Sequence, residues 1–216
     1  MKALIFGATG LVGSVLVHLL IKDARYQKIT LLNRKNLELQ HEHLSQHEID
    51  FSSLDLYKNE FNVDHVFCCL GTTIKKAKNQ DAFRKIDHDL VVQLAKLSNE
   101  NGAGHFLFVS AMGAHAHSKI FYNRVKGEAE QSVLEVGLQK TSWVRPSLLL
   151  GERQEARPGE KIGEFFMKPF SFLMRGSFKK YAPIQAETVA QKMIDLANEE
   201  NQGKENFPWS KTISSI

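Results

Sequence analysis

A tyrosine and a lysine four residues apart, Tyr122 and Lys126, could together move a proton. On a helix, positions i and i+4 share a face, so the phenol and the ammonium would project side by side. A neighbouring cation favours the phenolate and lowers a pKa that is ordinarily about 10. Such a phenol could exchange a proton with a substrate oxygen near neutral pH. The spacing alone does not decide between this chemistry and a solvated helix face.

A glycine-rich turn near the start of the chain predicts a dinucleotide site. Lys2–Phe6 reads as a short buried strand, Gly7-Ala-Thr-Gly-Leu-Val-Gly13 follows at once, and a helical apolar pattern comes next. Strand, turn and helix in this order open a dinucleotide-binding βαβ unit. Gly7 permits a tight turn, Gly10 lets the backbone approach a pyrophosphate, and Gly13 lets the helix pack near the sheet.

Phosphates are attracted to such a turn by backbone N–H groups and by the positive end of the helix dipole. The residues expected to line the cofactor here are Gly7, Thr9, Gly10, Leu11, Val12 and Gly13. The spacing is G-x-x-G-x-x-G, whereas many dehydrogenases have G-x-G-x-x-G. The alternative is three turn glycines in an ordinary α/β protein, but the strand before and the helix after the turn favour the dinucleotide site.

Two basic residues after the second strand bear on the choice of cofactor. Arg34 and Lys35 follow the apolar run Ile29–Leu32. An acidic residue in this region binds the ribose 2′-hydroxyl of NAD, whereas an arginine accommodates the 2′-phosphate of NADP. No carboxylate occurs between Asp23 and Glu38, so nothing there would repel that phosphate. A planar guanidinium can hold the phosphate with a lysine nearby. A solvated basic turn is the alternative, and the pattern favours NADP(H).

Further apolar runs alternate with helical patterns along the chain. Runs at His65–Leu70, His105–Val109 and Thr141–Val144 read as strands, and helical patterns occupy Leu90–Ala95 and Val189–Ala197. Continuous apolar strands separated by helices indicate a parallel sheet covered on both faces. We therefore expect an α/β doubly wound parallel sheet, a Rossmann fold, in a single domain over residues 1–216. Residues 151–185 would form a small substrate-side segment within it.

A shorter strand is expected near His47–Ile49. It would end at Asp50 and Phe51, where an adenine edge could be contacted. The apolar stretch Phe165–Met174 could form a lid over a substrate pocket, a partner surface or simply core.

Composition excludes several classes of protein. With 216 residues, 43% of them hydrophobic, the chain can bury a full core without disulfides or metals. The net charge of +4 has no basic run beyond Lys75-Lys76-Ala-Lys78, which is either a solvated loop or a local attraction for an anionic cofactor. Nucleic-acid binding would require a stripe of positive charge with aromatic platforms, and it is not expected.

The remaining reactive side chains favour no metal and no disulfide. Cys68 and Cys69 are adjacent in a strand pattern, where neighbouring side chains point to opposite faces, so they should be buried and unbridged. His115 and His117 lack a third ligand in view, so a polar loop is preferred to a metal site. Met1 leads directly into the first strand, and no apolar stretch would cross a membrane. We therefore expect no signal peptide, no membrane insertion and a cytoplasmic location.

Taken together, these motifs resemble the short-chain dehydrogenase/reductase superfamily, in its extended or atypical branch. More narrowly, the chain is similar to the HIV Tat-interacting oxidoreductase group and its bacterial NAD(P)-binding relatives. The likeness covers nearly the whole length. Its motifs, in order, are Gly7–Gly13, Cys68-Cys-Leu-Gly-Thr-Thr73, Ile86-Asp-His-Asp89, Val109-Ser110, Tyr122-Asn-Arg-Val-Lys126 and Val144-Arg-Pro-Ser-Leu-Leu149.

The resemblance implies a catalytic centre of Ser110, Tyr122 and Lys126. Ser110 would bond the substrate oxygen, Tyr122 would act as general acid or base, and Lys126 would bond the nicotinamide ribose and depress the phenol pKa. Further cofactor contacts are implied after the fourth strand and after the sixth: Cys69, Leu70, Gly71, Thr72, Pro146 and Leu148. Asp87 falls where relatives have a polar residue, although helix solvation explains it equally.

The implied activity is NADPH-dependent reduction of a small carbonyl compound by hydride transfer. Only about 65 residues follow Gly151, too few for a full-size sugar-nucleotide domain, so nucleotide-sugar specificity is doubtful. The alternative is a regulatory protein that senses NADPH without turnover. The retained Ser110, Tyr122 and Lys126 favour the enzyme, which would act as a monomer or homodimer.

Overall fold

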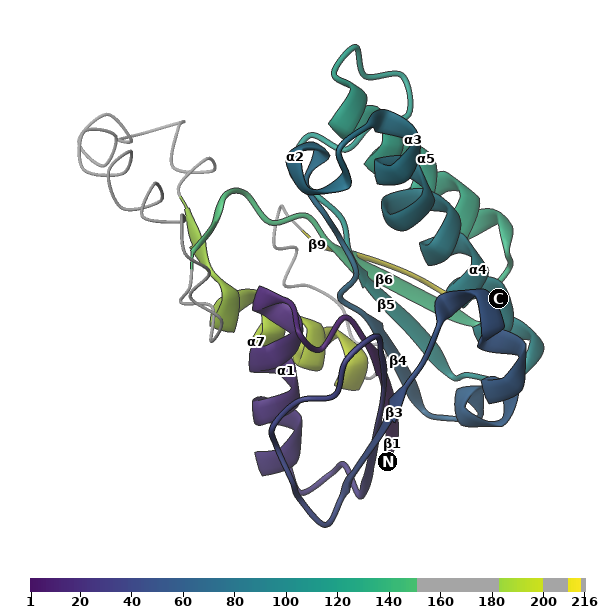
Figure 1. The fold of residues 1–216 in the computed structure, drawn as a ribbon, viewed down its shortest axis with the longest axis vertical. Coiled ribbons are helices and arrows are strands. Elements are labelled where there is room, and N and C mark those ends of the chain that lie inside the picture. Colours follow the sequence, from purple (N-terminus) through teal and green to yellow (C-terminus); the bar gives the residue numbers. More distant parts are fainter. Residues whose placement is uncertain (151–182, 200–209, 215–216) are drawn as a thin grey trace.

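The computed structural model describes residues 1–150, 183–199 and 210–214. A seven-stranded sheet runs through them in the order β3-β2-β1-β4-β5-β6-β9 (Figure 1). Neighbours from β3 to β6 are parallel, and β9 lies antiparallel at the edge beside β6. The expected doubly wound parallel sheet is confirmed. Its strands are β1 Lys2–Phe6, β2 Lys28–Asn33, β3 Leu44–Glu48, β4 His65–Cys68, β5 His105–Val109, β6 Lys140–Val144 and β9 Ser210–Ser214.

Three strand expectations need correction. The third strand begins earlier than expected, at Leu44, and ends at Glu48. The fourth strand ends at Cys68, two residues before the expected end at Leu70. The antiparallel strand β9 was not expected, since its residues Ser210–Ser214 carry no continuous apolar run.

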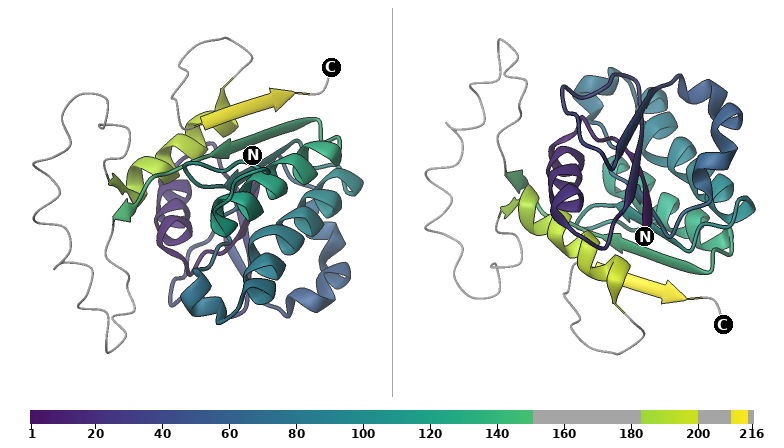
Figure 2. Two further views of the ribbon diagram at one scale, coloured as in Figure 1. Left: turned by 90° about the horizontal axis from the view of Figure 1, so that it is seen from above. Right: turned by 90° about the horizontal axis from the view of Figure 1, so that it is seen from below.

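Helices cover both faces of the sheet (Figure 2). Helices α1 (Leu11–Lys22) and α7 (Ala186–Asn198) lie on one face. The opposite face carries the helical segment η1 and helices α4 and α5, with bounds Phe51–Phe61, Leu90–Glu100 and Phe121–Glu135. The connection from β2 to β3, over residues 34–43, contains no helix, so α7 packs directly against α1.

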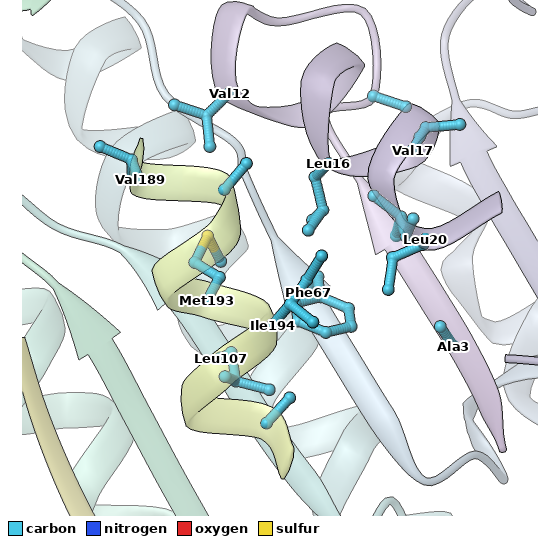
Figure 3. Close-up of a cluster of buried hydrophobic side chains, with 14 of the residues drawn as sticks. Ala3, Val12, Leu16, Val17, Leu20, Phe67, Leu107, Val189, Met193 and Ile194 are labelled. Atoms are coloured by element: carbon cyan, nitrogen blue, oxygen red, sulfur yellow. The ribbon is translucent and has the colours of Figure 1, made fainter. Parts of the chain in front are cut away.

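The core has two halves because successive strand residues point to opposite faces. Ala3 and Ile5 face α1 and α7, whereas Leu4 and Phe6 face η1 and α4. In the first half, the apolar stripe of α1 meets that of α7 above Phe67 of the sheet (Figure 3). The labelled side chains of this contact are Val12, Leu16, Val17 and Leu20 from α1 and Val189, Met193 and Ile194 from α7.

A wide helical turn interrupts the long helix after β4. The helices α3 (Gln80–Arg84) and α4 are joined without a break by a π-helical segment, η2 (Lys85–Asp89). Asp87, at its centre, is only 1% exposed. Single π turns inside α-helices often mark functional positions, because they redirect a side chain.

The parallel strands end together at one edge of the sheet. Phe6 pairs with Leu32 and with Cys68, and Val109 pairs with Val144. The strand order reverses between β1 and β4, the point at which ligands bind in open α/β sheets. The loops that carry the expected cofactor and catalytic residues therefore leave from this carboxyl edge.

A second, two-stranded sheet pairs β7 (Leu149–Leu150) with β8 (Ile184–Gln185). It brackets the expected substrate-side segment, of which residues 151–182, including Phe165–Met174, lie outside the described residues. Within the described ranges, no helix is both long and apolar enough to cross a membrane.

Candidate active site at the carboxyl edge of the sheet

The glycine-rich turn is packed so closely that side chains cannot fit at two of its positions. Gly7 has φ +79°, and a Cβ there would lie 2.7 Å from the carbonyl oxygen of Cys69. A Cβ on Gly13 would lie 2.2 Å from the carbonyl oxygen of Gly7. The first turn of α1 therefore rests directly on the loop, in the way that the glycine spacing predicts.

Three backbone amides at the start of α1 face outward from this turn. The first helical bond joins Ser14 N–H to the carbonyl of Gly10, so the N–H groups of Leu11, Val12 and Gly13 have no partner within the helix. Gly10 is the N-cap and supplies no side chain to them, and the first turn contains no acidic residue. This arrangement suits the pyrophosphate of a dinucleotide.

Asn33, the last residue of β2, binds the turn from the side. It is 3% exposed, and its Oδ1 accepts a hydrogen bond from Ala8 N–H at 3.1 Å. Its buried Nδ2 has no partner within the described part of the chain. A buried donor without an acceptor is expected where a ligand supplies that acceptor, so this corner fits a dinucleotide.

The other expected adenosine residues surround this corner. Arg34 and Lys35 follow Asn33 and are exposed. Asp50 is exposed and caps η1, and the backbone N–H that Ser52 donates to it lowers the pKa of its carboxyl group. Phe51 is half-buried, with its ring centroid 6.4 Å from that of Phe6 at the end of β1.

The loop after β4 connects the glycine turn to the catalytic helix. Cys69 N–H donates to the carbonyl of Phe6 at 2.9 Å, which extends the ladder between β1 and β4. A Cβ on Gly71 would lie 3.4 Å from Oδ1 of Asp87 and 3.9 Å from Nζ of Lys126. Thr72 N–H donates to Oδ2 of Asp87 at 2.9 Å. The loop therefore lies directly over the side chains of Asp87 and Lys126.

Neither cysteine in this region is a reactive thiol. Both are free, and burial raises the pKa of Cys68 to about 12 and that of Cys69 further. Leu70, between Cys69 and Gly71, packs against the core half beneath α4.

Lys126 lies buried at the centre of the site. It shares a face of α5 with Tyr122, as expected, and its side chain is 5% exposed. Its Nζ lies 2.8 Å from Oδ1 of Asp87 and donates to the carbonyl oxygen of Val109 at 3.2 Å. Burial opposes its charge, but Asp87 and Tyr122 outweigh burial, and the pKa of Lys126 is raised. Asp87 is therefore a buried partner, and helix solvation does not explain it.

Lys126 lowers the pKa of Tyr122, as expected, but burial raises it by more. Burial raises the pKa of the phenol, Lys126 lowers it and Asp87 raises it, and the net direction is upward. The expectation of a lowered pKa is wrong for this structure, because the phenol packs beside Phe83, ring centroids 5.4 Å apart, and Asp87 offsets the ammonium.

Ser110 lies directly after β5, and its hydroxyl is already engaged. Its N–H donates to the carbonyl of Val144 at 2.8 Å, and its hydroxyl donates to the carboxylate of Glu130. Glu130 is buried and also accepts from both Nε, at 2.9 Å, and Nη2 of Arg145. Ser110 thus belongs to a second charged cluster at the same edge.

The sequence reasoning missed Glu130 and Arg145. The signal was the four-residue spacing that continues from Tyr122 through Lys126 to Glu130, which places all three on one face of α5. Arg145 is part of the motif Val144–Leu149, but no role was predicted for it. A buried carboxylate on that face requires a cation from a neighbouring segment, and Arg145, directly after β6, supplies it.

The loop after β6 reaches the same region. Pro146 is buried, and its carbonyl accepts from Met112 N–H at 2.9 Å, which ties this loop to the one carrying Ser110. Leu148 is 63% exposed. The expected nicotinamide residues are therefore placed after β6 at the carboxyl edge, Pro146 within the fold and Leu148 at its surface.

The other reactive side chains remain apart from this centre. His115 and His117 are exposed, with their rings 5.6 Å apart. Among the described residues, no group of three or more His, Cys, Asp or Glu could hold a metal ion. Lys75, Lys76 and Lys78 are exposed on and just after the short helix α2 (Ile74–Ala77).

Comparison with known proteins places this geometry in context. A family model described as the NAD dependent epimerase/dehydratase family matches residues 3–168. The rat protein HTATIP2 is 39% identical over 213 residues, covering 97% of this chain and 86% of its own length. The Saccharomyces cerevisiae protein named FMP52, mitochondrial, is 31% identical over 222 residues, covering 100% of this chain and 96% of its own length.

Solved structures show the same fold at lower identity. MoeE5 in complex with UDP-glucose and NAD has a TM-score of 0.70 at 16% identity, covering 94% of this chain and 74% of its own. UDP-glucose 4-epimerase from Thermotoga maritima with UDP-glucose has a TM-score of 0.59 at 19% identity, covering 72% and 58%. Both show a Rossmann-type fold.

These relatives correct the expected location. The proteins named FMP52 from Saccharomyces cerevisiae and Candida albicans are mitochondrial by name, and they align along nearly the whole of this chain. The expectation of a cytoplasmic protein is therefore wrong as it stands. It depended on Met1 leading directly into a strand, and that feature does not decide the compartment.

Proposed function

Because the chain belongs to the NAD dependent epimerase/dehydratase family, within the short-chain dehydrogenase/reductase superfamily, we propose that it reduces a small carbonyl compound with NADPH. One observation carries this proposal. Tyr122 stands on α5 beside the buried Lys126, and Asp87 and the Gly71–Thr72 loop tie Lys126 to the edge that holds the glycine-rich turn. This arrangement supports a proton donor beside a dinucleotide site.

Each side chain has a role in this proposal. The nicotinamide group supplies a hydride when bound. Tyr122 gives its proton to the carbonyl oxygen, and its raised pKa suits a group that must be protonated before the step. Lys126, held by Asp87, fixes the position of the phenol and offers N–H groups to a ribose. Ser110 can turn its hydroxyl from Glu130 to the substrate oxygen, because Arg145 still pairs with Glu130.

The choice of NADPH over NADH is supported by charge. Arg34 and Lys35 are exposed just after β2, and the side chain that ends β2, Asn33, is neutral. A 2′-phosphate would meet two cations here, and the first carboxylate along this loop is Glu38, three residues after Lys35. The loop is also held in place, since Gln46 of β3 accepts from Leu37 N–H at 2.9 Å and donates to Leu39 O at 2.7 Å.

A second function has a specific observation in its favour. The Ser110 hydroxyl is donated to Glu130, and the Tyr122 pKa is raised. Both features would also suit a protein that binds NADPH and changes its partner contacts without turnover. Such a regulator would keep the glycine-rich turn and Arg34 but would have no use for the proton of Tyr122.

A turnover screen separates the two functions. Wild type and Tyr122→Phe are each incubated with NADPH and a panel of small aldehydes and ketones, and absorbance of the reduced cofactor is followed. We expect wild type to oxidise NADPH, and Tyr122→Phe to do so at least about a hundredfold more slowly. Tyr57→Phe, a change on η1 away from the catalytic helix, is the matched control and should retain the wild-type rate. Tight NADPH binding with no turnover of any carbonyl would support the regulator instead.

A further inference from the structure

The hydroxyl group of Ser110 donates its hydrogen bond to Glu130, a buried carboxylate on α5. A hydroxyl group has one proton, so it donates to one acceptor at a time, but its oxygen can also accept. While its proton is bonded to Glu130, Ser110 can therefore meet a ligand only as an acceptor. A ligand hydroxyl group can donate to such an oxygen at once. A carbonyl oxygen has no proton, so it needs Ser110 as the donor.

Arg145 fixes the carboxylate of Glu130 in one orientation. Its Nε donates to Oε1 at 2.9 Å and its Nη2 donates to Oε2, so the planar guanidinium binds both oxygens. Oε1 also accepts from Ser110 and therefore has two donors. The side chain of Glu130 is 6% exposed and that of Arg145 is 38% exposed, so the carboxylate lies on the inner side of the pair.

The backbone on both sides of this contact is also tied. Ser110 N–H donates to the carbonyl of Val144, directly before Arg145, at 2.8 Å. Two residues further along each loop, Met112 N–H donates to the carbonyl of Pro146 at 2.9 Å. The movement that these bonds leave easiest is rotation of the Ser110 hydroxyl proton about the Cβ–Oγ bond.

Arg145 also lowers the cost of that rotation. If the hydroxyl turns away, Oε1 keeps its bond from Nε of Arg145, so the buried carboxylate still has a donor on each oxygen. The neighbouring ion pair is separate, because Nζ of Lys126 contacts Asp87 and the carbonyl of Val109. The Ser110 proton can therefore move between two acceptors without leaving a buried charge unpaired.

We infer that Glu130, held by Arg145, is a positioning residue that sets the hydrogen-bond polarity of Ser110, so that the site favours a ligand hydroxyl group over a carbonyl oxygen. The inference rests on the proposed function for the nature of the ligand, an alcohol or its carbonyl form. The Ser110 proton points to Glu130 in the free protein and when the alcohol is bound, and it turns to the ligand when a carbonyl compound binds.

Titration of a thiol at position 110 tests the contact without any turnover. Ser110→Cys places a thiol beside Glu130, and ultraviolet absorbance follows thiolate formation between about pH 6 and 10. Cys68 and Cys69 do not titrate in this range, because burial raises the pKa of Cys68 to about 12 and that of Cys69 further. Adding Glu130→Gln removes the negative charge while nearly keeping the shape. We expect the ionisation constant of the thiol to rise at least about tenfold, a fall of about 1 in its pKa. An unchanged pKa would overturn the inference.

Two further variants separate this contact from a general disturbance of packing. Glu128→Gln, in the same Ser110→Cys background, is the matched control, because Glu128 lies on the same helix but pairs with Arg84. It should leave the thiol pKa unchanged. Arg145→Gln should instead raise the thiol pKa, because the carboxylate is then uncompensated. If Glu130→Gln does not fold, as judged by circular dichroism, Arg145→Gln decides, and no rise in the pKa would then overturn the inference.

Steady-state kinetics test the selectivity between the two forms of the ligand. The KM of one carbonyl compound from the turnover screen with NADPH, and that of its alcohol with NADP⁺, are measured for wild type and Glu130→Gln. An amide oxygen is a weaker acceptor than a carboxylate, so the ratio of the carbonyl KM to the alcohol KM should fall at least about threefold. Loss of structure would raise both values, and an unchanged ratio would overturn the selectivity. If no carbonyl compound turns over, the proposed function fails, whereas the thiol titration still decides the role of Glu130.

Discussion

The two edges of the central sheet both bury polar side chains, but they satisfy them in different ways. At the amino edge, Tyr26 Oη lies 2.8 Å from Nδ1 of His65 and accepts from Asn198 at 3.0 Å. His105, beside His65, contacts Ser142 Oγ through Nε2 at 2.8 Å. Burial lowers the pKa values of the two histidines, so these groups are neutral at pH 7.

The carboxyl edge instead buries charges. Asp87 and Lys126 form an ion pair there, Glu130 and Arg145 form another, and Nδ2 of Asn33 has no partner within the described residues. Buried charges are costly compared with neutral networks, and they are retained where chemistry needs them. The contrast teaches that burial of polar groups does not mark a site by itself. Buried charge distinguishes the carboxyl edge from the amino edge.

Asp87→Ala should give the largest effect, because it leaves the ammonium of Lys126 buried without its carboxylate. We expect the free energy of unfolding to fall by about 3–5 kcal/mol, measured by urea denaturation. Asp55→Ala, which removes an exposed pair with Lys58, is the control and should leave stability nearly unchanged. A loss of under about 1 kcal/mol for Asp87→Ala would mean that the charge pair is not a buried unit.

Acidification should destabilise the protein through the amino edge. Burial lowers the pKa of His65 to about 4 and that of His105 to about 3, against about 6.5 when unfolded. The unfolded chain therefore binds more protons below pH 6.5, and stability falls as the pH drops from 6.5 toward 4. Each histidine contributes up to about 1.4 kcal/mol per pH unit. Denaturation curves between pH 7 and 5 measure this slope, and His105→Gln should make it shallower.

Tyr26→Phe should destabilise the protein without affecting cofactor binding. The change removes the partner of Nδ1 of His65 and one of the two bonds that Asn198 donates, since its Nδ2 still donates to the carbonyl of Ile194, and the expected cost is about 1–3 kcal/mol. Thermal and urea unfolding measure the loss, and calorimetry should show unchanged NADPH affinity. A change in that affinity would contradict the claim that the amino edge does not contribute to cofactor binding.

Arg34→Ala should show the reverse behaviour, with almost no effect on stability. Its side chain is exposed, so the free energy of unfolding should change by less than about 0.5 kcal/mol. NADPH affinity should fall about tenfold, about 1.4 kcal/mol, while NADH affinity stays constant. Lys22→Ala, at the end of α1 remote from the turn, is the matched control. Equal losses for both dinucleotides would remove the 2′-phosphate argument.

The sequence predicted the scaffold well for physical reasons. Continuous apolar runs and glycine spacing are local signals, and they located β1, β2, β5 and the close packing of Gly13 on Gly7. The four-residue spacing placed Tyr122 and Lys126 on one face. The sequence did not reveal which side chains contact Tyr122 and Lys126, because those contacts join segments that are distant in the chain.

Asp87 illustrates the limit. Its burial follows from the π-helical turn of η2, which has no clear sequence signature, and its pairing with Lys126 joins residues 39 positions apart. That pairing, with burial of the phenol, reversed the expected shift of the Tyr122 pKa. The Glu130–Arg145 pair was not predicted either, although the four-residue spacing along α5 places Glu130 on the same face as Lys126.

Transfer of deuterium from NADPH deuterated at C4 tests most directly whether the carboxyl edge is a reducing centre. The product of a turned-over carbonyl compound is analysed by mass spectrometry for wild type, Tyr122→Phe and Tyr26→Phe. Wild type and Tyr26→Phe should place one deuterium in the product at similar rates, and Tyr122→Phe should slow this at least about a hundredfold. Undiminished transfer in Tyr122→Phe, or a product without deuterium in wild type, would contradict the account.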